Sequence, residues 1–275
     1  MPNNENIRKK PIGVFDSGLG GLSAVRELIK ILPNEDIVYF GDTGRVPYGN
    51  KSNTTVIRYA KQDIAFLLSK GVKAVVAACG TVSSVYKPDS DLNIPFFGVL
   101  TSTCMKAVNS TKNGRIGVIG TSATIKSKSY EQQIKLLDKN VSVFVKSCPL
   151  FVPLVENGFV TPDNQITKLT VAHYLKELKN SDVDTLILGC THYPLISHII
   201  SDYMGSDVTL INSGKETALY TRKMLKQSNL LNPSATKGNQ FYYISDTADE
   251  FKQIAGLFLQ TQLNDNVQQI NIENY

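Results

Sequence analysis

The sequence predicts an α/β protein with parallel sheets, organised as two similar domains. Short apolar runs alternate with amphipathic stretches along the 275-residue chain, which is the pattern of βαβ units. The chain is 42% hydrophobic, which is enough material for two cores of ordinary size. A faint repeat is the third observation, because Ile-Gly-Val-Phe-Asp-Ser at 12–17 resembles Ile-Gly-Val-Ile-Gly-Thr at 116–121. We therefore expect doubly wound sheets with helices on both faces.

The apolar runs predict strands, taken in order, at residues 12–15, 37–40, 72–78, 96–100, 116–119, 141–145, 183–188, 208–211 and 241–244. Helical spacing of apolar residues predicts helices at 21–32, 55–68, 125–137, 166–178 and 215–226. The last strand and helix need a sheet to join. We therefore expect a first domain at 1–99, to which 212–275 returns, and a second domain at 100–211.

Composition narrows the class of protein. No run approaches the roughly 18 to 20 apolar residues of a membrane span. Residues 1–10 are polar and lack the apolar core of a secretory signal, so we expect a short frayed tail and a cytoplasmic protein. The net charge of +5 is scattered along the chain and tryptophan is absent. Nucleic acid is therefore a poor candidate partner, and an acidic small molecule fits better.

Two of the four cysteines occupy matching places. Cys79 closes the apolar run 74–78 and Cys190 closes 185–189, so each thiol lies at the carboxyl end of a predicted parallel strand, where α/β proteins bind ligands. Hydroxyl residues follow both, which predicts a helix N-terminus and favours the thiolate form. Alternatively, free cysteines are small buried hydrophobes, which is how we interpret Cys104 and Cys148. If the two halves face each other, two thiols flank one carbon atom, which suits racemisation without a cofactor.

Asp16 and Ser17 follow the first strand and open the segment Asp-Ser-Gly-Leu-Gly-Gly. A dinucleotide-binding loop is excluded because Ser23 takes the place of the last glycine and Asp16 would repel a pyrophosphate. The carboxylate suits an ammonium group or a thiol awaiting a proton. The alternative is a helix-capping pair in a tight turn, and both interpretations are compatible.

Turn residues at 41–49 follow the second strand. Backbone N–H groups beside Tyr48 would bind a carboxylate, although a plain surface loop and a solvated Arg45 are competing interpretations. His192 lies two residues from Cys190 and is placed to tune or relay its proton, with Glu156 as a candidate carboxylate nearby. A Cys-x-His pair lacks the ligand count of a zinc site, so we expect no metal.

Four motifs occur together in one order: Asp-Ser-Gly-x-Gly-Gly, Tyr-Phe-Gly-Asp-x-x-x-x-Pro-Tyr-Gly, a strand-end Cys-x-Thr, and Gly-Cys-Thr-His-Tyr-Pro. From residue 12 to about residue 217 the chain resembles bacterial glutamate racemases of the aspartate/glutamate racemase family. The resemblance implies two α/β domains related by pseudo-twofold symmetry, with the active site in the cleft between them. It implies cofactor-independent conversion of L-glutamate to D-glutamate for peptidoglycan synthesis. It also implies a homodimer, because dimerisation is common in the family.

The resemblance also implies a role for each matching residue. Cys79 would serve the D-isomer with help from Asp16, and Cys190 would serve the L-isomer with help from Glu156 and His192. Asp16 and His192 would also bind substrate. The remaining substrate-binding positions would be Ser17, Gly80, Thr81, Thr121 and Thr191 at the α-carboxylate and amine end, and Pro47, Tyr48 and Gly49 at the distal carboxylate.

One position departs from this pattern. The family has asparagine after the first cysteine, where it contacts the substrate amine and carboxylate, and this chain has Gly80. The departure leaves open a related racemase with another substrate, such as aspartate, and a weakly active racemase-fold protein with a binding or regulatory role. A pyridoxal-phosphate racemase is disfavoured because the motifs indicate neither a Schiff-base lysine nor a phosphate cradle.

Overall fold

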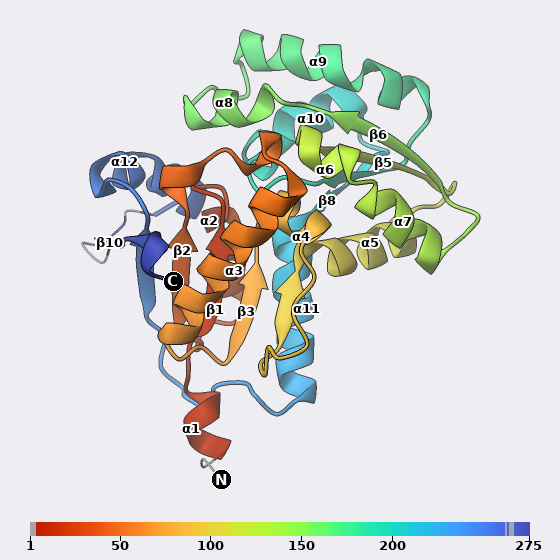
Figure 1. Ribbon diagram of the computed structural model, residues 1–275. Helices are drawn as coiled ribbons and strands as arrows, with labels where there is room; N and C mark the ends of the chain where they lie inside the picture. Colours follow the sequence, from red (N-terminus) through yellow and green to blue (C-terminus); the bar gives the residue numbers. More distant parts are fainter. Residues whose placement is uncertain (1–3, 262, 264–266) are drawn as a thin grey trace.

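The computed structural model describes residues 4–261, 263 and 267–275, and it contains two parallel sheets (Figure 1). The first sheet has the strand order β10-β9-β2-β1-β3-β4, built from β1 Ile12–Asp16, β2 Ile37–Gly41, β3 Ala74–Ala77, β4 Phe96–Gly98, β9 Gln240–Ile244 and β10 Val267–Gln269. The second has the order β6-β5-β7-β8, built from β5 Arg115–Gly120, β6 Ser142–Ser147, β7 Thr185–Leu188 and β8 Thr209–Asn212. This confirms the predicted fold class.

The internal repeat is visible in the strand order. The run β2-β1-β3-β4 of the first sheet corresponds position by position to β6-β5-β7-β8 of the second. The repeated hexapeptides at 12–17 and 116–121 therefore form the equivalent central strands β1 and β5, each paired with parallel neighbours on both sides. A buried central strand needs apolar residues on both faces, which is why these two segments keep similar sequences.

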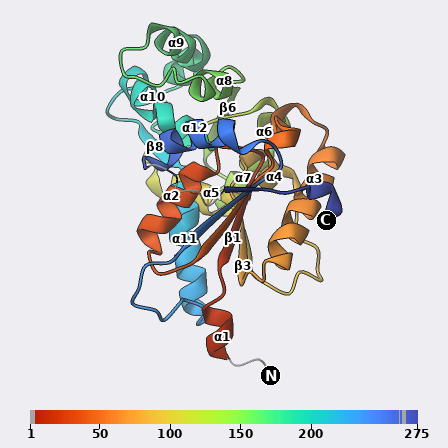
Figure 2. The same cartoon turned by 90° about the vertical axis from the view of Figure 1, so that its left-hand side faces the viewer.

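Helices cover both faces of the first sheet. On one face lie α2 Leu22–Ile31, α11 Ser213–Gln227 and α12 Ala248–Leu259, and on the other lie α3 Asn53–Ser69 and the short α4 Gly80–Val85 (Figures 1 and 2). Strand β1 follows the two-residue period, because Val14 belongs to the first of these cores and Phe15 to the second.

The second sheet is built in the same way. One face is covered by α5 Val99–Ser110 and α7 Ser129–Leu137, and the other by α8 Phe151–Glu156, α9 Gln165–Asn180 and α10 Ser197–Met204, with the short α6 Ser122–Lys126 at the strand ends. Helix α11 leaves β8 of the second sheet and packs against both α2 and α5. The chain then enters β9 beside β2, so the segment after β8 contributes strands to the first sheet.

Three sequence expectations were wrong in detail. Residues 4–8 form the helix α1 Asn4–Arg8 rather than a frayed tail. Two hydrogen bonds hold its end: Arg8 Nε donates to the carbonyl of Leu231 at 2.9 Å, and the backbone carbonyl of Arg8 accepts from Lys73 Nζ at 2.5 Å. The predicted helix 125–137 is broken between α6 and α7 at Lys128, whose φ of 56° is left-handed. The predicted strand 96–100 ends at Gly98, where α5 begins.

Short 3-10 helices complete the chain: η1 Thr43–Arg45, η2 Tyr48–Asn50, η3 Tyr193–Ile196 and η4 Ile272–Asn274. The first two lie in the segment after β2 and the third lies in the segment after β7. Among the helices of the described residues, none combines the length and the apolar character that crossing a membrane requires.

Candidate active site

A cavity of about 410 Å³ lies where the carboxyl ends of the two sheets meet. Both halves contribute to its wall, as expected for strand ends of parallel sheets that face each other. All the sequence-predicted site residues except Asp16 line it: Ser17, Pro47, Tyr48, Gly49, Cys79, Gly80, Thr81, Thr121, Glu156, Cys190, Thr191 and His192. The structure therefore brings together residues that are more than half the chain apart in sequence, such as Ser17 and His192.

Cys79 follows β3 and is the N-cap residue of α4. Its Sγ lies 3.6 Å from Ser17 Oγ, and the residue is only 4% exposed. Burial raises the pKa of the Cys79 thiol to about 12, the negative charge of Asp16 adds to this, and the N–H of Val82 and the Ser17 hydroxyl only partly oppose it. The expectation that the helix N-terminus favours a thiolate is wrong for Cys79, because desolvation of the anion outweighs the helix dipole.

Cys190 follows β7 and belongs to a chain of three polar side chains. Its Sγ lies 3.7 Å from His192 Nδ1, and His192 Nε2 lies 2.9 Å from Glu156 Oε1. Burial opposes a charged imidazole, but the hydrogen bonds with Cys190 and Glu156 outweigh it and raise the pKa of His192 to about 10. The imidazole is therefore cationic at neutral pH. The imidazole therefore places a positive charge and a hydrogen-bonding nitrogen beside Cys190 Sγ.

Asp16 lies behind the cavity wall and is fully buried at the end of β1. Its Oδ2 accepts from the backbone N–H of Gly18 at 3.2 Å, while Oδ1 has no hydrogen-bond partner among the described residues. Burial raises the pKa of its carboxyl, and the charge of His192 and nearby backbone N–H groups oppose that rise. Asp16 thus adjoins the site without forming part of its surface.

Hydroxyl groups from both halves meet across the cleft. Thr81 Oγ1 and Thr121 Oγ1 are 3.1 Å apart, and Ser23 Oγ donates to the carbonyl of Thr191 at 2.8 Å. Thr121 is also the N-cap residue of α6 and accepts from the N–H of Thr124. These short, uncharged donors suit the carboxylate of an amino acid, because they bind it without fixing a permanent opposing charge.

Residues 46–50 of the loop after β2 line the cavity, and the hydroxyl of Tyr48 is bound to acidic side chains of the first half. The Tyr48 hydroxyl donates to Asp42 and lies 3.2 Å from Asp63 Oδ2, and the residue is 1% exposed. Burial raises the pKa of Asp63 well above its usual range, with the charge of Asp42 adding to it. The Tyr48 hydroxyl is therefore already engaged within the protein.

Arg45 holds that loop from behind. Its guanidinium lies 2.7 Å from Asp42, 3.1 Å from Asp63 and 3.3 Å from Glu273, and its side chain is 11% exposed. The interpretation of Arg45 as a solvated surface charge was wrong, because two of its three carboxylate partners are buried.

Sequence reasoning missed part of the wall. Pro149, Val152 and Pro153 line the cavity from the segment after β6. Their position is equivalent to that of the loop after β2, so extending the repeat from β1 and β5 to the next strand pair would have found them. Cys104 and Cys148 are buried and do not line the cavity. In the described part of the chain, no group of three His, Cys, Asp or Glu side chains is arranged to hold a metal ion.

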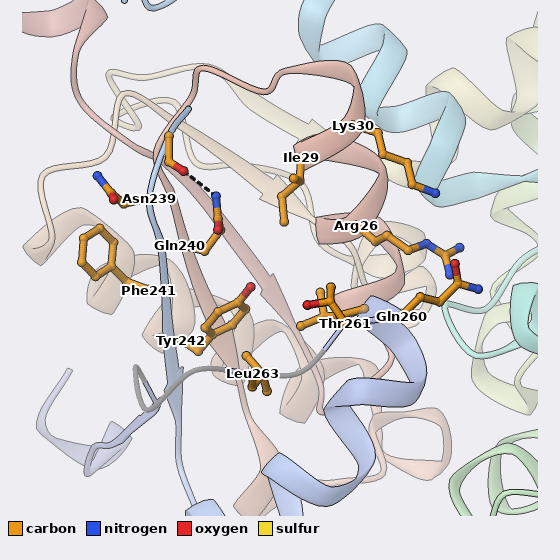
Figure 3. A pocket seen from close by; sticks show the side chains of 12 residues that line it. Arg26, Ile29, Lys30, Asn239, Gln240, Phe241, Tyr242, Gln260, Thr261 and Leu263 are labelled. Carbon is orange, nitrogen blue, oxygen red and sulfur yellow. Dashed lines mark hydrogen bonds between the residues drawn. The ribbon is translucent and has the colours of Figure 1, made fainter. Parts of the chain in front are cut away.

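A second cavity, of about 560 Å³, lies at the edge of the first sheet (Figure 3). Its lining comes from Arg26, Ile29 and Lys30 of α2, from β9 and from the end of α12. None of the predicted site residues lines it. It therefore has no part in the chemistry of the two thiols.

The fold and the first cavity define a class: a racemase-type α/β protein in which two equivalent strand ends each present one thiol to a shared cleft. The model of the family described as Asp/Glu/Hydantoin racemase matches residues 32–221, and the chain belongs to this family. A glutamate racemase of Geobacter metallireducens is 44% identical over 266 residues, which cover 96% of this chain and 97% of that protein.

Solved structures agree. Glutamate racemase of Francisella tularensis, solved in complex with D-glutamate, superposes with a TM-score of 0.90 at 37% identity, covering 98% of this chain and 100% of that one. Glutamate racemase of Thermus thermophilus, solved with β-chloro-D-alanine, has a TM-score of 0.87 at 38% identity and covers 98% and 99%. The family resemblance predicted from the four motifs is confirmed.

Proposed function

We propose that this protein interconverts L-glutamate and D-glutamate with Cys79 and Cys190 as its acid/base pair, without an organic cofactor, and so supplies D-glutamate for peptidoglycan synthesis. One observation carries the proposal. The two thiols follow equivalent strands, β3 and β7, and line one cavity from opposite halves of the molecule. Their identity with the two motif cysteines, and the glutamate racemases to which the chain is similar, support it.

The proposed reaction removes the proton from one face of the α-carbon and adds a proton to the opposite face. For L-glutamate, the Cys190 thiolate removes the α-proton and becomes a thiol, leaving a carbanion, and the Cys79 thiol protonates the opposite face and becomes a thiolate. The direction from D-glutamate reverses both steps. The raised pKa of Cys79 fits its role as the acid, and the cationic His192 fits the role of Cys190 as the base. Asp16 would assist Cys79, and Glu156 would assist Cys190 through His192.

An α-proton is far too weakly acidic for a thiolate unless the site stabilises the carbanion. The hydroxyls of Ser17, Thr81, Thr121 and Thr191 supply donors for the α-carboxylate, where negative charge develops. The N–H groups around Tyr48 and Gly49, beside Pro47, supply donors for the distal carboxylate. Because the cavity wall is largely buried, these hydrogen bonds act in a medium of low dielectric constant, which strengthens them.

The test is incubation of the purified protein with D-glutamate, and separately with D-aspartate, in heavy water, followed by optical rotation and NMR of the α-position. Cys79→Ala and Cys190→Ala variants accompany it, with Cys104→Ala as the matched control because that thiol is buried outside the cavity. The proposal expects glutamate to racemise with α-deuteration in the wild type and the control, and in neither site variant.

Aspartate is the second candidate substrate, and Gly80 is the observation that favours it, because the family resemblance places a substrate-contacting asparagine there. Turnover of aspartate alone would replace glutamate in the proposal. An absence of exchange with both substrates would move the assignment to a binding or regulatory role.

Three further expectations belong to this proposal. The domain division into 1–99 with 212–275, and 100–211, is tested by native-state hydrogen exchange, in which each of the two parts should exchange as one cooperative unit. The homodimer is tested by light scattering after size-exclusion chromatography. The cytoplasmic location is tested by fractionation of cells that produce the protein.

A further inference from the structure

The residue after the first cysteine, Gly80, lies against the backbone of the opposite half. A Cβ atom placed on Gly80 would lie 2.3 Å from the carbonyl oxygen of Gly189 and 3.3 Å from its carbonyl carbon. Gly189 immediately precedes Cys190, and both glycines line the cavity. The chain therefore has no room for any side chain at position 80 while the two halves keep this separation.

The same close approach occurs at two other glycines of the first half. A Cβ on Gly20 would lie 2.2 Å from Thr191 Oγ1, and a Cβ on Gly49 would lie 2.9 Å from Thr121 Cβ. Real Cβ atoms do not occur at such distances from backbone or from fixed side chains. The first half thus has glycines at three points of close contact with the second half. Of these three, Gly80 is the one whose added Cβ would meet a backbone atom, which cannot rotate away as a side chain can.

The Gly189 carbonyl occupies the place where a side chain at position 80 would project. Its oxygen is an acceptor, and it accepts no hydrogen bond from the residues that the structure describes. Gly189 itself is buried. A buried carbonyl without a partner is costly unless a ligand or water supplies a donor, and a substrate ammonium group is a strong donor.

Building on the proposed function, we propose that Gly80 and the Gly189 carbonyl together replace the family asparagine. Gly80 is a positioning residue that lets the halves approach until the Gly189 oxygen accepts from the substrate ammonium group, and this contact sets the separation of the two thiols. In this protein the backbone carbonyl of Gly189 therefore takes over the substrate contact that the asparagine side chain makes in the family. It follows that restoring asparagine harms this protein, although the same residue serves its relatives.

The test uses Gly80→Asn and Gly80→Ala in the full chain, with Gly256→Ala as the matched control. A Cβ on Gly256 lies 3.6 Å from its nearest neighbour, in ordinary contact, and Gly256 is outside the cavity. For both Gly80 variants we expect kcat/KM for glutamate to fall on the order of 10- to 100-fold, because displacement of reacting groups by about 1 Å has effects of this size. Asparagine should be no better than alanine. A Gly80→Asn variant as active as the wild type would overturn the proposal.

Two readouts separate positioning from a general loss of folding. Dibromobimane, which reacts with two thiols, should link Cys79 to Cys190 several-fold faster in the wild type than in Gly80→Ala, with Cys79→Ser as the background. Equal rates would contradict the assigned role of Gly80. This comparison needs no turnover, so it holds even if the wild type fails to racemise glutamate, an outcome that would refute the proposed function alone.

A wild-type measurement covers the case in which Gly80→Asn does not fold. Glutarate has both carboxylates of glutamate and no ammonium group. As a competitive inhibitor, it should bind on the order of 10-fold more weakly than glutamate, because the Gly189 oxygen and its neighbours then lose their donor. Equal binding of glutarate and glutamate would show that no acceptor in the cavity recognises the ammonium group.

Discussion

Replacement of Glu156 by glutamine tests how the second thiol is activated. Glu156 Oε1 lies 2.9 Å from His192 Nε2, and His192 Nδ1 lies 3.7 Å from Cys190 Sγ. Glutamine has nearly the same shape and keeps a hydrogen bond to the imidazole, but it removes one negative charge. The variant therefore changes the charge balance at His192 without opening a hole in the wall.

The magnitude follows from exposure. The side chain of His192 is 8% exposed and the side chain of Glu156 is 37% exposed, so solvent screens the ion pair between them. A screened ion pair contributes about 1 kcal/mol, which corresponds to a fall in the pKa of His192 of roughly 0.7 units. The wild-type pKa of about 10 lies above the unfolded value of 6.5. The charged His192 side chain therefore stabilises the folded protein fully below about pH 6.5, and this contribution to the free energy of unfolding is lost as the pH rises through 10.

The assay measures both rate and stability against pH. We expect the alkaline limb of kcat/KM to move down by roughly 0.7 units in Glu156→Gln. The free energy of unfolding in urea should be about 1 kcal/mol lower than in the wild type at pH 6, with no difference above pH 10. Because the enantiomers have equal free energy, kcat/KM must fall by the same factor in both directions.

Glu177→Gln is the matched control. Glu177 also forms a 2.9 Å ion pair, with Lys146, but its side chain is 79% exposed and does not line the cavity. It should leave the pH profile of kcat/KM unchanged. The reasoning is refuted if Glu156→Gln lowers the rate without moving the alkaline limb, or if the stability difference grows as pH rises.

Three other substitutions test separate parts of the structure. Gly20→Ala places a Cβ 2.5 Å from His192 Nδ1, so kcat/KM should fall on the order of 100-fold and the urea midpoint should fall as well; an unchanged rate would contradict the close contact. Arg45→Met leaves two buried carboxylates without their cation, so unfolding should cost about 3 kcal/mol less and KM for glutamate should rise. Lys73→Met removes the buried ion-pair partner of Glu35, and neither residue lines the cavity. The thermal midpoint should therefore fall, while kcat and KM measured at 25 °C should stay within roughly two-fold. A change in KM would refute a purely structural role for Lys73.

Sequence reasoning found the strands more reliably than the helices. The central strands β1, β3, β5 and β7 are buried on both faces, so their apolar runs stand out against polar flanks. Helix α5 was missed because Val99 begins it directly after β4, and the apolar run continues across the boundary. Strand β10 is short and at the sheet edge, where two of its three residues are exposed, so it carries no apolar signal.

Most of the cavity wall was also predictable, because strand-end motifs in a repeated α/β chain converge on one edge of each sheet. What the motifs did not reveal was the state of each group. The thiol pKa of Cys79 depends on desolvation by residues distant in sequence, and the surroundings of Arg45 depend on Asp63 of α3 and Glu273 near the C-terminus.

The sequence by itself determined the class of fold, the repeat and the pair of thiols, because hydrophobic periodicity and strand-end chemistry are local properties of the chain. Only the tertiary structure decided how closely the two halves approach. That distance depends on atoms from both halves, such as Gly80 and the Gly189 carbonyl, which are far apart in sequence and carry no side chain to signal their contact. The close contact between Gly80 and the Gly189 carbonyl, and the burial of the charged side chains nearby, arise only when the two halves pack against each other.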